Sequence, residues 1–146
     1  MLAKIYSGTV IGLDGILIEV EVDVAAQGFP GFTIVGLPDK SVAEAKERVR
    51  AAIINASFKV PDTRITVNLA PADIPKVGSA FDLPIAVGIL SASGMIKKEI
   101  LNDSLFLGEL SLRGDVRRVS GAISIALLAK SKKIKKIFVS RENISE

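Results

Sequence analysis

The fold is decided by the stretch Ile16-Leu17-Ile18-Glu19-Val20-Glu21-Val22-Asp23-Val24. Every second residue of this stretch is a branched apolar residue, and three of the residues between them are acids. Because successive side chains of a strand point to opposite faces of a sheet, the alternation predicts a strand with one buried face and one wet acidic face. Leu13-Asp14-Gly15 before it predicts a tight turn, which makes residues 3–11 the partner strand of a hairpin.

Outward from this hairpin, strand and helix patterns follow one another. Strands are predicted at 32–35, 64–70 and 135–139, and a second hairpin at 105–116 turns at Arg113-Gly114-Asp115. Helices are predicted at 41–56, 81–92 and 121–130, the second of them apolar nearly all round and therefore central and buried, with Pro84 near its start. The last strand is expected to lie parallel to an earlier one. This order predicts one α/β domain over residues 1–146, with a mixed sheet and about three main helices.

Two short-range patterns predict how helices begin. Ser41 and Glu44 have the S-x-x-E spacing of a capping box. Ser79 precedes the buried helix and is interpreted as its cap, although Lys76 and Ser79 could in principle form a Ser–Lys catalytic dyad. Asp82 is expected to complement the dipole of the same helix.

The composition excludes several kinds of chemistry. The chain has no cysteine and no histidine, which excludes disulfides, thiolate metal sites, cysteine nucleophiles and histidine-based triads. No apolar run approaches the ~20 residues that cross a bilayer, and the first residues do not resemble a signal peptide. We therefore expect a cytoplasmic protein with no membrane contact.

The sequence also predicts that this domain holds no cofactor and no metal ion. Gly31 and Gly36 have the spacing of half a phosphate loop, but Leu37-Pro38-Asp39 separates them from Lys40-Ser41. Asp73 and Asp82 lack the other oxygen ligands that a cation would need.

Charge is distributed unevenly along the chain. Residues 113–141 hold nine basic side chains and one acid, although the net charge is only +3. A solvated face is the favoured interpretation, and weak, salt-dependent contact with a nucleic-acid backbone is the alternative. The candidate residues for contact with DNA or a protein partner are Arg113, Arg117, Arg118, Lys130, Lys132, Lys133, Lys135 and Lys136.

Four segments together resemble the N-terminal domain of the ComM/YifB family of magnesium-chelatase-like AAA+ ATPases. They are residues 34–39, 47–53, 67–73 and 76–84. The resemblance implies a two-layer, Lon-protease-like fold, in the superfold shared with ribosomal protein S five domain 2 and small-molecule kinases. It also implies that an AAA+ module follows Glu146, and that the full-length protein uses ATP and magnesium.

The same resemblance permits a test of catalysis. It places the serine position of the Lon dyad at Ala80 and the lysine position at Ile123, so this domain is expected not to be an enzyme. Ser79 with Lys76 is the fallback. We therefore expect an accessory and assembly domain that packs against its own AAA+ module and neighbouring subunits of a ring, in a protein that drives DNA branch migration during natural transformation. A cryptic Ser–Lys peptidase and a magnesium-chelatase subunit domain are the alternatives.

Overall fold

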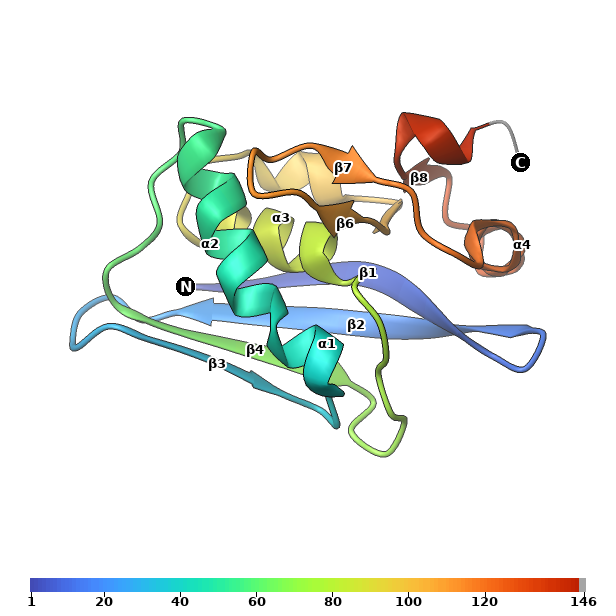
Figure 1. The fold of residues 1–146 in the computed structure, drawn as a ribbon, viewed down its shortest axis with the longest axis horizontal. Coiled ribbons are helices and arrows are strands. Elements are labelled where there is room, and N and C mark those ends of the chain that lie inside the picture. The colour runs from blue at the N-terminus through green and yellow to red at the C-terminus, as the bar shows by residue number, and fades with distance from the viewer. Residues whose placement is uncertain (145–146) are drawn as a thin grey trace.

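The computed structural model describes residues 1–144, so that Ser145 and Glu146, the end of the predicted domain, lie outside the described residues. Strands β1 (Leu2–Ile11) and β2 (Asp14–Val24) form the long hairpin predicted from the sequence (Figure 1). The predicted turn is wrong in position. Ile11 pairs with Asp14, so the turn consists of Gly12 and Leu13. Gly12 supplies the positive φ of 65° that the turn requires, and Asp14 and Gly15 join the strand ladder instead.

A mixed six-stranded sheet is built around this hairpin in the order β3-β4-β2-β1-β5-β8. Its other strands are β3 (Gly31–Val35), β4 (Arg64–Ala70), β5 (Ser104–Phe106) and β8 (Lys136–Phe138). The pairs β3–β4, β1–β5 and β5–β8 are parallel, and the pairs β1–β2 and β2–β4 are antiparallel. The mixed sheet and the parallel last strand are thus confirmed. The second predicted hairpin is shorter than expected: β6 (Glu109–Leu110) and β7 (Val116–Arg117) form a separate ribbon, whereas residues 105 and 106 belong to β5 of the main sheet.

The helices are α1 (Lys40–Ala43), α2 (Ala45–Asn55), α3 (Asp82–Ala92) and α4 (Ala122–Ser131), with short 3-10 turns η1 (Lys98–Leu101) and η2 (Arg141–Asn143). The first predicted helix is interrupted at Glu44, and the predicted capping box is wrong. Ser41 lies inside α1, while Asp39 is the cap and accepts a 2.7 Å hydrogen bond from the Val42 N–H.

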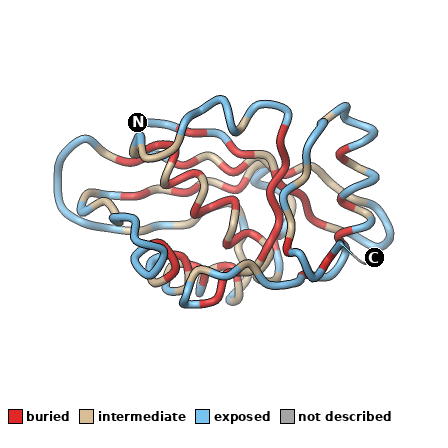
Figure 2. The backbone as a smooth tube through the Cα atoms, turned by 90° about the horizontal axis from the view of Figure 1, so that it is seen from above, coloured by how far each residue is buried: buried red, intermediate tan, exposed pale blue. Residues whose placement is uncertain are grey.

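Helix α3 is the central buried helix that the sequence predicts. It packs on β1 and β2 so closely that a Cβ on Gly88 would stand 2.4 Å from Val22 Cγ2. Pro84 is the third residue of α3, where the helix requires no backbone donor, so it neither bends nor ends the helix. Figure 2 shows the buried positions gathered in the middle of the molecule, with the outer loops and the N-terminus exposed.

Helix α4 covers the opposite face of the sheet. Ile5 points toward α3, so by alternation Gly8 points away from it, and a Cβ on Gly8 would stand 2.8 Å from Ile125 Cδ1 of α4. Ile125 belongs to a second, smaller core that also takes in Tyr6 and Leu17. None of the helices within residues 1–144 is long and apolar enough to span a bilayer.

Candidate functional site

A cleft of about 510 Å³ lies between the N-terminal ends of α3 and α4 and the end of β1. Three segments that are distant in sequence line it, namely residues 8–10, 77–81 and 118–121. The site therefore exists only once the sheet has brought β1 beside the loops that precede the two helices. Ala80, the serine position implied by the resemblance to Lon, lines this cleft.

The loop before α3 is held in place by Asp39. Its carboxylate accepts the Val42 N–H through Oδ1 and the Gly78 N–H, at 3.2 Å, through Oδ2. Its backbone N–H donates to the Lys76 carbonyl at 2.9 Å. One aspartate thus caps α1 and fixes the wall of the cleft, a role that the sequence analysis missed because it assigned the cap to Ser41.

The structure does not join Lys76 to Ser79. Lys76 is fully buried, and its ammonium group donates to the Pro71 carbonyl oxygen. Burial lowers the pKa of Lys76, and the nearby charge of Asp73 opposes that shift. Ser79 lines the cleft, Lys76 does not, and no hydrogen bond between the two occurs within residues 1–144.

The predicted cap of α3 is wrong. The helix begins after Phe81 and has no side-chain cap, because Ser79 lies one turn too early. Ser79 takes part only through its backbone, since its carbonyl oxygen accepts the Asp82 N–H at 3.2 Å. The Ser79 hydroxyl is therefore not committed to the helix start.

Ala80 and Ile123 lie on different surfaces of the protein. Ile123 is in the first turn of α4, is 56% exposed and lines a separate apolar groove with Phe138 and Ile144. It does not line the cleft that contains Ala80. Neither side chain carries a group that attacks a carbonyl or transfers a proton.

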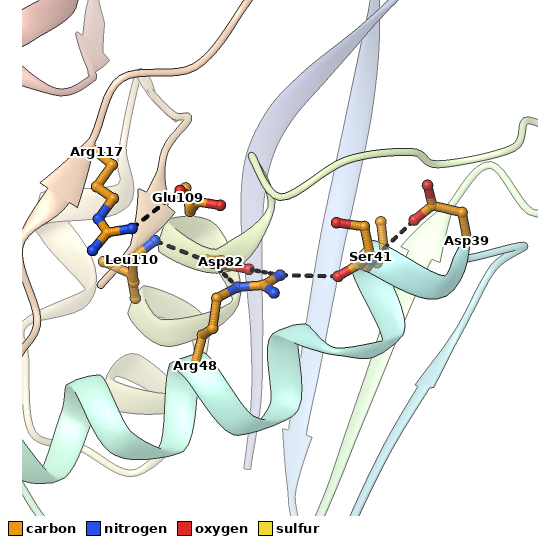
Figure 3. A network of polar contacts seen from close by, with 8 residues as sticks. Asp39, Ser41, Arg48, Asp82, Glu109, Leu110 and Arg117 are labelled. Carbon is orange, nitrogen blue, oxygen red and sulfur yellow. Dashed lines mark hydrogen bonds and ion pairs between the residues drawn. The ribbon is translucent and has the colours of Figure 1, made fainter. Parts of the chain in front are cut away.

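The shortest ion pair in the described part of the chain joins Arg48 of α2 to Asp82 of α3, and neither residue lines the cleft (Figure 3). Arg48 Nε lies 2.6 Å from Asp82 Oδ2, and Arg48 Nη2 lies 3.0 Å from Oδ1. Arg48 Nη2 also donates to the Ser41 carbonyl, and the Leu110 N–H donates to Asp82 Oδ2 at 3.1 Å. Asp82 is the first residue of α3, but its carboxylate is turned toward α2 and β6.

The two charges of this pair respond differently to their surroundings. Burial raises the pKa of Asp82, and the hydrogen bonds from Arg48 and from the Leu110 N–H oppose the shift. The hydrogen bond to Asp82 raises the pKa of Arg48. One signal in the sequence could have indicated this pair, because an aspartate in a run that is otherwise apolar needs a buried partner.

The structure separates the basic candidates into three places. Arg113 lies in the β6–β7 turn, which packs against α2 at Gly114. Arg117, on β7, approaches Glu109 at 4.0 Å, and Arg118 lines the cleft. The five lysines lie together at the end of α4 and the start of β8, at the opposite end of the molecule from α2 (Figure 1).

We call Lys130, Lys132, Lys133, Lys135 and Lys136 the lysine corner. All five are exposed, and none forms an ion pair with a carboxylate in the described part of the chain. The lysine corner lies next to one acidic residue, Asp103, which falls outside residues 113–141 and so was not among the charges counted there. The Asp103 carbonyl oxygen accepts the N–H groups of Lys135 and Lys136 at 3.1 and 2.9 Å.

Comparison with known proteins places these features in a family. A family model described as subunit ChlI of Mg-chelatase matches residues 20–143. Competence protein ComM of Haemophilus influenzae is 48% identical over 145 residues, which cover 99% of this chain and 28% of that protein. Uncharacterized protein YifB of Escherichia coli is 44% identical with the same coverage.

A protease is also among the similar proteins. Lon protease 2 of Bacillus subtilis is 32% identical over 144 residues, which cover 88% of this chain and 26% of the protease. The Lon-protease-like α/β fold predicted from the sequence is thereby confirmed. The chain spans only 26–28% of the length of these three relatives. Because the family model matches most of the chain, and ComM and YifB match nearly all of it, the chain belongs to the family of subunit ChlI of Mg-chelatase, within its ComM/YifB-like members.

Proposed function

We propose that this chain is a non-catalytic accessory and assembly domain of a magnesium-chelatase-like AAA+ ATPase that acts on DNA. In this proposal ATP and magnesium are bound by an AAA+ module elsewhere in the polypeptide, and neighbouring subunits form a ring. The lysine corner carries the DNA-directed part of the proposal. The 48% identity with a protein named as a competence protein supports DNA over a magnesium-chelatase role.

The lysine corner has the properties of a surface that binds phosphates without reading sequence. Five exposed ammonium groups within residues 130–136 lack a carboxylate partner within residues 1–144. A protein cation that contacts a DNA phosphate releases a condensed counterion, so binding through such groups weakens steeply with salt. Because the chain has only one tyrosine and six phenylalanines, and none of them falls within residues 130–136, we expect backbone contacts rather than base stacking.

The test is charge reversal in the 146-residue chain. We expect Lys132→Glu/Lys133→Glu to weaken binding to duplex DNA and to reduce the slope of log affinity against log salt by roughly 1 for each phosphate contact that is lost. Fluorescence anisotropy titrations at several salt concentrations measure both quantities. The matched control is Arg50→Glu/Lys59→Glu, which makes the same change of net charge with exposed residues at and beyond α2. Equal weakening by both double variants would show a net-charge effect and remove the lysine corner from the proposal.

The non-catalytic part of the proposal rests on Ala80, Ile123 and Lys76. The first two side chains offer no reactive group, and the Lys76 ammonium is buried on the Pro71 carbonyl. We expect no hydrolysis of casein by the chain. If hydrolysis is measured and Ser79→Ala abolishes it, the peptidase alternative replaces the accessory role.

A further inference from the structure

The β3 edge of the main sheet has an unused side. Strand β3 ends the six-stranded sheet and pairs with β4 alone among residues 1–144 (Figure 1). We propose that β3 is an interface for a second copy of this chain, which pairs with it antiparallel about a two-fold axis at Thr33 and joins the two sheets into one. This contact is isologous, so it differs from the head-to-tail contact between subunits of a ring. It goes beyond the proposed function and does not depend on it.

The backbone groups that point to this edge follow from the pairing on the other side of β4. The Arg64 carbonyl oxygen accepts the N–H of the residue that follows β2, at 2.9 Å. Because backbone groups of successive strand residues point to opposite sides, those of Ile65 and Val67 face β3. Ile65 lies opposite Phe32. Val67 lies opposite Ile34, and in a parallel pair a residue bonds to the two neighbours of its partner. The N–H and C=O groups of Phe32 and Ile34 therefore point to the open edge.

An axis at Thr33 uses all of these groups. Phe32 of one copy then lies opposite Ile34 of the other, and each such pair exchanges two hydrogen bonds. Pro30 and Gly36 set the limits of the pairing, because proline has no N–H and the φ of 107° at Gly36 ends the extended backbone. An axis at Phe32 or Ile34 would place one of the free residues opposite Pro30 or Gly36.

The side chains that this axis brings together are compatible. Thr33 meets Thr33 of the second copy on the exposed face of the sheet, and Val35 meets Gly31 there. On the other face, Phe32 and Ile34 pack partly buried against the main core, and the axis places them opposite each other. Threonine pairs and pairs of an aromatic with a branched residue stabilise neighbouring strands. Residues 31–35 carry no charge, so the pairing opposes no like charges.

The two edges of the sheet differ in how they are protected. The strand at the far edge, β8, begins with Lys136 and follows Lys135, and lysine is a common means by which natural proteins keep an edge strand from pairing. Strand β3 has no such residue. Instead, Phe29 before it is 92% exposed and Leu37 after it is 52% exposed. An antiparallel second copy brings its Leu37 beside Phe29, which removes apolar surface from water at both ends of the contact.

The first test is the state of association of the 146-residue chain. A contact through one short strand is at the low end of interface sizes, so we expect a dimer with a Kd of about 10–300 μM. Sedimentation velocity from about 10 μM to about 1 mM measures it. A chain that stays monomeric throughout this range would overturn the proposal.

The second test is a cross-link that depends on the register. The chain has no cysteine, so Thr33→Cys introduces a single thiol. Directly opposite residues of a pair without mutual hydrogen bonds have Cα atoms about 4.5 Å apart, which a disulfide can span. We therefore expect Thr33→Cys to form a disulfide-linked dimer under a mild oxidant. The matched control is Val35→Cys on the same exposed face, where the two thiols are separated by about 13 Å along the strands. We expect it to cross-link at least about tenfold more slowly, and equal rates would contradict the axis.

The third test places like charges at the axis. Thr33→Lys opposes two ammonium groups, and we expect it to weaken the dimer about tenfold. The control Thr66→Lys adds the same charge one strand further in, beside Thr33 on β4, and should leave the association nearly unchanged. In a ¹H–¹⁵N NMR dilution series of the unmutated chain, the amide signals of Phe32 and Ile34 should move with concentration. An unaltered dimer in Thr33→Lys, or movement of signals in β8 instead of β3, would each rule out this interface.

Discussion

Arg48 and Asp82 are 34 positions apart in the chain and form a two-bond ion pair whose carboxylate is fully buried. The pair joins α2 to α3, and the Leu110 N–H adds β6 to the same carboxylate. The Asp82 carboxylate thus holds α2, α3 and β6 together at one point. A buried carboxylate is tolerated in a fold only when its charge is compensated by its partners. The loss of Arg48 should therefore lower the free energy of unfolding substantially.

We predict that Arg48→Met lowers the free energy of unfolding by about 3–5 kcal/mol, since it leaves the Asp82 charge buried without its cation. Asp82→Asn should cost less, because the Arg48 side chain is 22% exposed and can reach water. Urea denaturation followed by circular dichroism measures both. The control is Arg117→Met, which removes a 61% exposed side chain 4.0 Å from Glu109 and should cost about 0–1 kcal/mol. A loss in Arg48→Met no larger than in this control would contradict the structural role of the pair.

The pH dependence of the Arg48→Met variant follows from the same carboxylate. Burial raises the pKa of Asp82 above 3.8, and removal of the Arg48 hydrogen bond should raise the pKa further. A carboxyl group whose pKa is raised in the folded state binds its proton more tightly when folded, so it stabilises the fold at low pH and loses that contribution as the pH rises. The stability deficit of the variant relative to the unmutated chain should therefore grow as the pH rises from about 4 and then level off. Urea midpoints for both chains between pH 3.5 and 7.5 provide the measurement, and a deficit that is constant over this range would contradict the assignment.

Close packing of α3 on the hairpin makes a separate prediction. A methyl group on Gly88 would stand 2.4 Å from Val22 Cγ2 and 3.3 Å from Ile5 Cγ1. Alanine gains about 1 kcal/mol of helix propensity over glycine, but overpacking a core costs about 1–3 kcal/mol. We expect Gly88→Ala to lower the stability, and Val22→Ala in the same chain to relieve part of the loss. Independent, additive losses in the double variant would show that the two residues do not compete for space.

The hairpin and α3 could be predicted from the sequence because their signals are periodic. The alternation of residues 16–24 and the apolar run of residues 81–92 each extend over many residues, so an error in a single turn or cap residue does not change the predicted element. The predictions of the first turn and of the helix caps were wrong because two polar patterns that favour such a position lie within a few residues of each other. Asp39 and Ser41 are both good caps, and only the position of Asp39 beside the Gly78 N–H shows why the aspartate is chosen.

The site was less predictable because its parts come from distant segments. Thr9, Ala80 and Ser120 meet only after the strands have paired, and nothing in their local sequence marks them as neighbours. The basic residues show the converse. Residues 113–141 look like one charged segment, but the β6–β7 turn places Arg113 against α2 while α4 carries the lysines to the other end. The alignment with Lon likewise placed the lysine position at Ile123 on α4, but it could not show which surface of the protein the Ile123 side chain faces.

Asn143 provides a last prediction, because it ties η2 to the wall of the cleft. Its side chain is buried, with Oδ1 accepting the Val119 N–H at 3.2 Å and Nδ2 donating to the Val119 carbonyl oxygen at 2.9 Å. An aspartate at this position can still accept the N–H but presents a negative charge to the carbonyl oxygen. We expect Asn143→Asp to lower the stability by about 1–3 kcal/mol at neutral pH, and to recover part of it in acid, where the protonated carboxyl can donate. Asn102→Asp is the matched control, since Asn102 is exposed and its side chain makes no hydrogen bond among residues 1–144. Thermal unfolding of both variants at pH 4 and pH 7 decides the matter: a pH-dependent loss in Asn143→Asp alone is expected, and equal behaviour of the two would mean that Asn143 does not hold Val119 in place.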